Sequence, residues 1–496
     1  MVFRNKIQAI VAESKDNRLR GPTRKQIRTT IDNAEKTFQR CWATLVSLKT
    51  LEGLNGASIL DFQPNLAAEL FNLDNAYRQL IRRRRILIGR KAFCAQTWFR
   101  KRMRALDQDL NALRTCMRLG RTLGDVFAWA FYRFDQPLLE RHLKHPANPH
   151  TPPGIGGRGE LEFIRRARPN GFLPLYHGVT TFLRIGDVSF FNLSKGRVSA
   201  IGELKSRSIA PGELALSVHI VSDNKEKIPF LDLGREITDK QKIAELSGSF
   251  SGVKSQVERQ MKKAAEALRP VTVSGNSDLR NAFHINELAD FASQLCTQGL
   301  SFKQVGKGLL LAGSEPYRGK SLSSRIFSKV SPAFVLRRMK RAKEHVLGIF
   351  DPALHDNGML CSELDNNVRL GLPPLFWLPC DIDFLEKVYF LRAIVATVYN
   401  PAHLFNALRE RGYEITSNWP INGPPRFEIR KAVRAGAAGV EQFNFFVGLI
   451  QHRFMREEAI IESFEHGLTE LHKLIQLHGL NSGQSARLEL SFVHML

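Results

Sequence analysis

The chain has 496 residues, of which 43% are hydrophobic, and its 72 Lys and Arg against 48 Asp and Glu give a formal net charge of +24. This length predicts about three domains of ordinary size. The hydrophobic content excludes a disordered chain. The excess positive charge favours a polyanionic partner, with nucleic acid first and an acidic membrane surface second.

The sequence predicts a soluble protein of a reducing compartment, which we expect to be the cytoplasm. No stretch approaches the roughly 20 apolar residues needed to cross a bilayer, so we expect no membrane span. The first residues, Met1 to Lys6, lack the apolar core of a signal peptide. The six cysteines are widely separated and form no Cys-x-x-Cys pair, which argues against a disulfide framework and against a cysteine zinc site.

Residues 1–134 predict a basic helical domain, because long stretches are poor in glycine and proline. Its most basic part runs from Arg78 to Arg104 without any Asp or Glu, and Trp98 and Phe99 lie among the cations. Such a mixture suits phosphate contact and base stacking, whereas the alternative is a solvated helix or one paired with acidic residues elsewhere. The candidate nucleic-acid-binding residues here are Arg82, Arg83, Arg84, Arg85, Arg90, Lys91, Arg100, Lys101 and Arg102.

Residues 276–350 predict a second basic, mostly helical segment, which includes Arg325. A nucleic-acid contact and a solvated face are equally compatible with its charge. An apolar run over 308–312 is typical of a buried strand within this segment.

Residues 135–275 predict an α/β core, because residues 160–270 carry signals for a helix, three strands and a further helix. The informative part is the stretch 186–205, in which two β-rich runs flank Ser194-Lys195-Gly196. This pattern predicts a hairpin with a three-residue loop that ends in glycine.

The predicted hairpin places two carboxylates opposite each other. With that loop, Leu193 pairs with Arg197, and Asp187 falls opposite Glu203. A two-residue turn would instead place Val188 opposite Glu203. Opposed carboxylates repel each other unless a cation lies between them.

Lys205 lies on the same strand face as Glu203 by the period-two rule. Two carboxylates and an ammonium on one sheet face predict a divalent-cation site made of hard oxygen ligands. In such a site the ammonium orients a water molecule or stabilises negative charge.

A third carboxylate is expected from the helix before the hairpin. Glu160 lies near the middle of its apolar face and Glu162 lies opposite that face. A carboxylate on an inward face needs a partner or a metal, which favours Glu160. The alternative is that Glu160 is a first-turn residue stabilised by the helix dipole.

Asp187 with Glu203-Leu204-Lys205 on adjacent strands resembles the PD-(D/E)XK nuclease superfamily, over roughly residues 155–270. The resemblance implies an α-β-β-β-α-β core with a central mixed sheet that cuts phosphodiester bonds using Mg²⁺, for which Mn²⁺ can substitute. It implies that Asp187, Glu203 and the backbone carbonyl of Leu204 are metal ligands. Lys205 would help to activate the attacking water, and Glu160 would match the acidic residue of the first core helix. Gly186 departs from the proline of the family motif.

The next helical pattern, over 252–264, would supply the second helix of such a core. Gln260 and Lys263 flank its apolar stripe and could reach a phosphate. The alternative for these two side chains is a half-exposed surface pair.

Residues 351–496 predict a C-terminal α/β or helical domain of unknown role. A strand is expected over 393–399, followed by a helix that begins at Asn400 and Pro401, and long helices are expected over 427–480. Several aromatic residues are expected to be exposed and to form a partner interface. They are Phe376, Trp377, Phe443, Phe445 and Phe446.

The sequence as a whole predicts an α/β core embedded in a mostly helical, multidomain chain. The expected function is a Mg²⁺-dependent endonuclease acting on nucleic acid, with DNA as the expected form, and bacterial anti-phage defence is the expected setting. The alternative is a non-catalytic, basic nucleic-acid-binding or assembly protein. A homodimer, or a protein partner bound through residues 351–496, is the expected assembly.

Overall fold

The computed structural model of the chain forms two compact units. Unit 1 comprises Met1–Phe131, Lys144–Arg269 and Gly319–Lys329, and unit 2 comprises Tyr132–Leu143, Pro270–Arg318 and Val330–Leu496. The residues that the structure describes are 21–53, 56–132, 135–145, 155–166, 172–210, 213–222, 283–328, 360–364, 373–378, 380–418, 426–433, 436–440 and 443–478.

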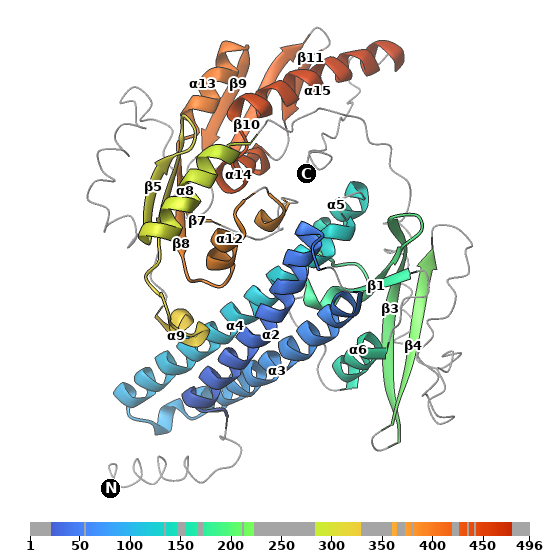
Figure 1. The fold of residues 1–496 in the computed structure, drawn as a ribbon, viewed down its shortest axis with the longest axis vertical. Coiled ribbons are helices and arrows are strands. Elements are labelled where there is room, and N and C mark those ends of the chain that lie inside the picture. The colour runs from blue at the N-terminus through green and yellow to red at the C-terminus, as the bar shows by residue number, and fades with distance from the viewer. Residues whose placement is uncertain are drawn as a thin grey trace. The chain divides into compact units, whose positions relative to one another are not determined.

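Unit 1 combines a bundle of long helices with an antiparallel sheet (Figure 1). Its helices are α2 (Arg24–Thr50), α3 (Gly56–Gly89), α4 (Gln96–Tyr132), α6 (Ile155–Arg166) and α9 (Leu322–Phe327), with the short 3₁₀ helices η2 (Lys91–Phe93) and η3 (His177–Val179). Its strands are β1 (Phe172–Tyr176), β2 (Val188–Asn192), β3 (Arg197–Ala210) and β4 (Glu213–Ser222).

The helix α2 illustrates why the bundle forms. Thr23 and Gln26 make a capping box that satisfies backbone N–H groups at the start of the helix. Buried apolar residues then recur every three or four positions, which produces one continuous apolar face toward the core. This face consists of Ile27, Ile31, Ala34, Phe38, Cys41, Trp42 and Leu45.

The sheet of unit 1 is a meander in the order β1-β2-β3-β4, with every neighbouring pair antiparallel. The helix α6 packs against β3 and also contacts α3, so it lies between the sheet and the helical bundle (Figure 1). The described part begins as expected, with one helix and then three strands, but a fourth strand, β4, follows directly where a helix was expected, and these four strands are antiparallel throughout instead of mixed. The predicted helix over 252–264 lies outside the described residues.

The bundle and the sheet are joined by hydrogen bonds from helix side chains. Gln63 of α3 donates to the Pro174 carbonyl and accepts from the Tyr176 N–H, both at 2.7 Å, so its amide occupies the outer edge of β1. Asp125 of α4 accepts from the backbone N–H and the hydroxyl of Thr181, at 2.6 and 2.7 Å. Unit 1 therefore contains elements from both sides of the domain boundary that the sequence predicts at residue 134.

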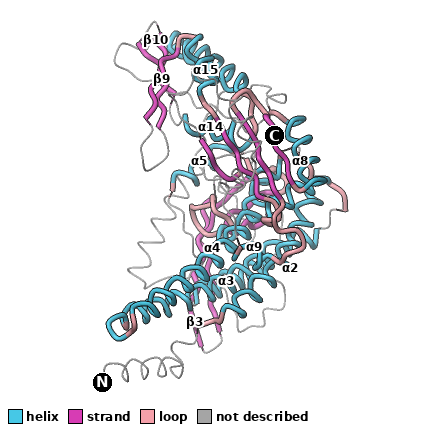
Figure 2. The backbone as a smooth tube through the Cα atoms, turned by 90° about the vertical axis from the view of Figure 1, so that its left-hand side faces the viewer, coloured by secondary structure: helices cyan, strands magenta, loops and turns pink. Residues whose placement is uncertain are grey.

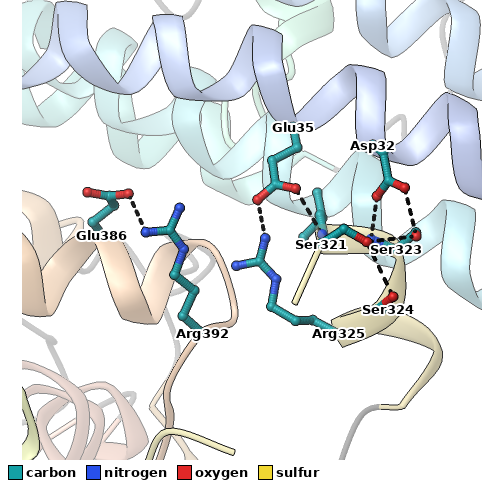
Figure 3. Close-up of polar contacts among 9 residues, drawn as sticks. Asp32, Glu35, Ser321, Ser323, Ser324, Arg325, Glu386 and Arg392 are labelled. Carbon is teal, nitrogen blue, oxygen red and sulfur yellow. Dashed lines mark hydrogen bonds and ion pairs between the residues drawn. The ribbon is translucent and has the colours of Figure 1, made fainter. Parts of the chain in front are cut away.

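Residues Gly319–Lys329 follow two strands of unit 2 in the sequence but belong to unit 1. Their helix, α9, packs against α2 (Figure 3). Asp32 accepts hydrogen bonds from the backbone and the side chain of Ser323, and Glu35 accepts from the Leu322 N–H. Arg325 is buried and forms an ion pair with Glu35. Arg325 is therefore a structural residue and not part of a solvated or nucleic-acid-binding face.

Unit 2 contains two further antiparallel sheets, in the orders β5-β6-β8-β7 and β11-β10-β9. Its helices are α5 (Gln136–Lys144), α8 (Ile285–Gln298), α12 (Ile382–Tyr389), α13 (Ala402–Glu410), α14 (Phe443–Arg453) and α15 (Glu457–His478), with the 3₁₀ helix η5 (Leu375–Trp377). Its strands are β5 (Leu300–Gln304), β6 (Leu309–Ser314), β7 (Leu360–Glu363), β8 (Ile394–Tyr399), β9 (Tyr413–Asn418), β10 (Arg426–Val433) and β11 (Gly436–Val440).

Two predicted strands of unit 2 are confirmed and one predicted helical region is partly wrong. The apolar runs at 308–312 and 393–399 form the neighbouring strands β6 and β8. The start of the region predicted as helix over 427–480 is instead the pair β10 and β11, and the helices begin at Phe443. Figure 2 shows β9 and β10 beside α15, to which β10 is linked by an ion pair between Lys431 and Glu465.

The prediction that the C-terminal aromatics are exposed is wrong for three of them. Phe376, Phe443 and Phe446 are buried, and the last two belong to a cluster of rings with Phe464. These rings belong to the core of unit 2, and this packing is sufficient reason for aromatic residues at these positions. None of the described helices is long and apolar enough to cross a membrane.

Candidate active site

The predicted register of β2 with β3 is confirmed for the described pairs next to the candidate residues, although Asp187 and Glu203 lie just beyond the paired part. Val188 pairs with Gly202 and Ser189 pairs with Ile201, the register that follows from placing Asp187 opposite Glu203. Next to the turn the prediction is one residue out, because Asn192 rather than Leu193 pairs with Arg197. A β-bulge restores the register between these two parts.

Asp187 lies directly before β2 and is held on β3 through both its backbone and its side chain. Its N–H donates to the Gly202 carbonyl at 2.8 Å, and its Oδ2 accepts from the Leu204 N–H at 2.7 Å. In an antiparallel strand the N–H and C=O of one residue face the same neighbouring strand. The carbonyl of Leu204 is therefore expected to face the Asp187 side of β3.

The glycine at position 186 has a structural reason. Gly186 has a φ of +70°, and a Cβ at this position would lie 2.7 Å from Ile201 and 2.8 Å from the Gly202 carbonyl. Proline is restricted to φ near −65°, so it cannot adopt this conformation. Glycine permits the bend that brings Asp187 onto β3.

Glu203 and Lys205 lie on the same face of β3 and form an ion pair of 2.6 Å. The Glu203 side chain is 8% exposed and the Lys205 side chain is 22% exposed. The ammonium therefore lies at the solvent edge of a largely buried group of charges. This arrangement agrees with the period-two expectation for the two residues.

Glu160 is buried on the inward face of α6, as its position in the apolar pattern predicts. It accepts a hydrogen bond from the hydroxyl of Tyr176, at the end of β1. The predicted alternative, a first-turn residue stabilised only by the helix dipole, does not describe this buried side chain.

Burial and neighbouring charges shift the pKa values of Asp187 and Glu160. Burial raises the pKa of Asp187 well above its ordinary value, and the charges of Glu203 and Glu160 raise it further. Burial also raises the pKa of Glu160 to about 7, and Glu203 adds to the increase. The charge of Lys205 lowers the pKa of both Asp187 and Glu160, but less than burial raises them. Such values are expected where carboxylates share a buried space with too little positive charge.

The donor set fits a hard divalent cation by its chemistry. Ionisation of all three acids beside one ammonium would leave two negative charges uncompensated, and Mg²⁺, which prefers oxygen ligands of this kind, would compensate them. Within the described residues, however, no group of three or more His, Cys, Asp or Glu side chains is arranged to hold a metal ion. Glu203 forms an ion pair with Lys205, and Asp187 accepts a hydrogen bond from the Leu204 N–H. A metal ion would therefore have to bind beside these partners, or the two side chains would have to change rotamer.

His177 lies next to the site but has a structural role. Its two ring nitrogens contact the Gly186 carbonyl at 3.1 Å and the Ser189 hydroxyl at 2.6 Å. Burial lowers its pKa to about 4, so the ring is neutral at physiological pH. It supports the bend before Asp187.

Sequence reasoning missed Tyr176 and Gln63 as neighbours of the site. Gln63 precedes its strand partners by more than 100 residues, and no local pattern connects the two segments. For Tyr176 a signal existed, since a polar ring ending the apolar run Phe172–Tyr176 needs a hydrogen-bond partner when buried.

The candidate nucleic-acid-binding residues of unit 1 surround the turn from α3 through η2 to α4, at the end of the helical bundle away from β1–β4 (Figure 1). We call this region the basic tip, residues 82–104. Arg82, Arg85, Lys91, Arg100 and Lys101 are exposed, and Arg83, Arg84, Arg90 and Arg102 are partly exposed. Arg84 pairs with Asp107, as the alternative of acidic pairing allows. Gln260 and Lys263 lie outside the described residues.

No protein-family model, curated protein or solved structure matches the chain.

Proposed function

We propose that the chain is a metal-dependent nuclease that hydrolyses phosphodiester bonds of nucleic acid, with DNA as the expected substrate. The supporting observation is that Glu160 on α6, Asp187 before β2, and Glu203 and Lys205 on β3 lie close enough for the charges of Glu203 and Lys205 to shift the pKa values of Asp187 and Glu160. This constellation resembles the site of PD-(D/E)XK nucleases. An α-β-β-β-α-β core is part of the proposal.

Each residue has a role in the proposed reaction. Asp187, Glu203 and the Leu204 carbonyl would hold Mg²⁺ or Mn²⁺, with Glu160 beside them. The bound ion would supply Lewis-acid stabilisation of the phosphate and a more acidic water. Lys205, at the solvent edge, would orient the attacking water and stabilise negative charge that develops on the phosphate.

The basic tip supports binding of a polyanion. Its exposed cations are suited to contact phosphates, which position the nucleic acid without reading its sequence. In this proposal, the basic tip holds the backbone and the carboxylate site cuts it.

The second candidate is a nucleic-acid-binding or assembly protein without catalysis. The observation that favours it is the ion pair of Glu203 with Lys205, together with the lack of a preformed metal cluster among the described residues. In such a protein the buried charges would only neutralise one another.

Lys205→Ala separates the two candidates. The full chain is incubated with supercoiled, linear and single-stranded DNA and with RNA, with Mg²⁺, with Mn²⁺ or with EDTA. The nuclease proposal expects metal-dependent cleavage by the wild type, its loss in Lys205→Ala, and retained binding. The matched control is Lys431→Ala, which removes the lysine of another ion pair with a glutamate, at 2.9 Å, and should cleave normally. Binding by the wild type without any cleavage would support the second candidate.

A further inference from the structure

Tyr176 connects the candidate site to the helical bundle. Its hydroxyl donates to Oε2 of Glu160, and its backbone N–H donates to Oε1 of Gln63 at 2.7 Å. Gln63 also donates to the Pro174 carbonyl, so α3 holds the outer edge of the strand at two points next to the tyrosine. The position of the hydroxyl is thus determined by two elements other than its own strand.

The chain also leaves room for the tyrosine ring. A Cβ on Gly178 would lie 2.3 Å from the Tyr176 hydroxyl oxygen and 2.4 Å from the carbon that bears it. Any side chain at position 178 would therefore push the hydroxyl away from its present place. The absence of a side chain at this position is an observation independent of the hydrogen bond to Glu160.

Glu160 approaches the site from a different element than the other two acids. It is carried by α6, whereas Asp187 and Glu203 lie on the β2–β3 hairpin, so the hairpin geometry alone does not fix its carboxylate. A carboxylate on a flexible stem of two methylene groups needs a second contact to be held in one place. The hydrogen bond from Tyr176 supplies this contact.

We propose that Tyr176 is a positioning residue that holds Glu160 as the third carboxylate of the site, with Gln63 and Gly178 fixing the tyrosine. The inference rests on the proposed function, because it concerns the same cation site. Groups that orient a metal ligand in this way typically change metal affinity by about ten- to a hundredfold when they are removed.

The test measures binding of Mn²⁺ to the full chain by electron paramagnetic resonance, together with cleavage over a range of Mn²⁺ concentrations. Tyr176→Phe should raise the Mn²⁺ dissociation constant by about tenfold or more. It should raise the Mn²⁺ concentration for half-maximal cleavage equally, and saturating Mn²⁺ should restore most of the rate. A loss of cleavage at all concentrations with unchanged Mn²⁺ binding would overturn the inference.

A double-mutant cycle isolates the contact with Glu160. Glu160→Gln removes the charge that Tyr176 holds, so adding Tyr176→Phe to it should weaken Mn²⁺ binding no further. Additive losses would show that Tyr176 acts by another route and would overturn the inference.

Tyr399→Phe is the matched control in unit 2. Tyr399 is fully buried and donates to Glu457 at 2.9 Å, so the variant loses the same kind of hydrogen bond. It should leave Mn²⁺ binding unchanged. If Tyr176→Phe does not fold, Glu160→Asp provides the second test, because it keeps the charge but draws the carboxylate back by one methylene group. It should also weaken Mn²⁺ binding, and unchanged binding would overturn the inference.

The outcomes distinguish the inference from the function on which it rests. A wild type that neither binds Mn²⁺ nor cleaves would remove both. A wild type that binds Mn²⁺ and cleaves, with Tyr176→Phe indistinguishable from it, would remove only the role of Tyr176.

Discussion

Nζ of Lys205 lies 2.6 Å from Oε1 of Glu203, two residues earlier on the same strand. The charge of the same ammonium also lowers the pKa values of Asp187 and Glu160, but burial and the neighbouring carboxylates raise them, so both acids are held toward their neutral form. A divalent cation would favour their ionised form. Because it would bind the folded chain only, it would stabilise that chain, and this leads to the first prediction.

Mg²⁺ should stabilise the wild-type chain against unfolding, by about 2.7 kcal/mol when its concentration is 100 times the dissociation constant. Glu203→Gln should remove most of this stabilisation, because it removes a proposed ligand. The measurement is thermal unfolding with Mg²⁺ and with EDTA. Glu457→Gln, which changes a buried glutamate of unit 2, is the control and should respond to Mg²⁺ like the wild type. An equal response of Glu203→Gln would contradict the proposed site.

Asp125 should make the stability of unit 1 depend on pH. Burial raises its pKa to about 7 from an ordinary value of 3.8, although hydrogen bonds from Thr181 lower it in part. The folded state therefore binds more protons than the unfolded state between these values, and the free energy of unfolding falls as pH rises through this window. The loss is a few kcal/mol, at about 1.4 kcal/mol per pKa unit.

The free energy of unfolding of Asp125→Asn should fall less as pH rises, because the amide cannot ionise. The amide oxygen still accepts a hydrogen bond from the Thr181 N–H. Urea unfolding at pH 5 and pH 8 measures the difference. Asp107→Asn, which alters a half-exposed aspartate, should keep the slope of the wild type. Parallel slopes for the wild type and Asp125→Asn would show that Asp125 is not the titrating group.

Much of the candidate site was predictable because it is local in the sequence. The alternation of the two strands predicted the register of Val188 with Gly202, next to Asp187 and Glu203, and the helical period placed Glu160 inward. The bulge was not predictable, since nothing in the sequence marks the extra residue. Tyr176 and Gln63 depend on packing between segments far apart in the chain.

The missed strands of unit 2 had a readable signal. Phe427 and Ile429 are buried while Glu428 and Arg430 are exposed, the alternation of a half-buried strand. The helical interpretation extended the pattern of α14 and α15 too far toward the N-terminus. Burial of Phe376 and Phe443 could not be predicted, because an aromatic residue suits a core and an interface equally.

Arg325→Met should destabilise unit 1 by about 3–5 kcal/mol, because it leaves the charge of Glu35 without its buried partner. Arg325 is 1% exposed. Arg430→Met is the control, since its ion pair with Glu428 is exposed on both sides and should contribute less than about 1 kcal/mol. Urea unfolding of both variants gives the comparison, and equal losses would argue against a buried pair.

The basic tip should contribute to nucleic-acid binding in a salt-dependent way. Arg82→Gln with Arg85→Gln should weaken binding of duplex DNA and reduce the slope of log K against log salt by about 0.9 for each phosphate that is no longer neutralised. The control with the same change of charge is Arg409→Gln with Arg411→Gln, at exposed positions of unit 2. Fluorescence anisotropy at several salt concentrations distinguishes the two. Equal slopes for both pairs would place the phosphate-binding surface elsewhere.

The path of the chain through α9 has a practical consequence for dissecting the protein. A fragment that ends before residue 319 would lack Ser323 and Arg325, and Asp32 and Glu35 would face water without the groups they bind. No single cleavage of the polypeptide separates unit 1 from unit 2 with both intact. Experiments on the carboxylate site alone would need the α9 peptide supplied in trans or fused by a linker to the shortened chain.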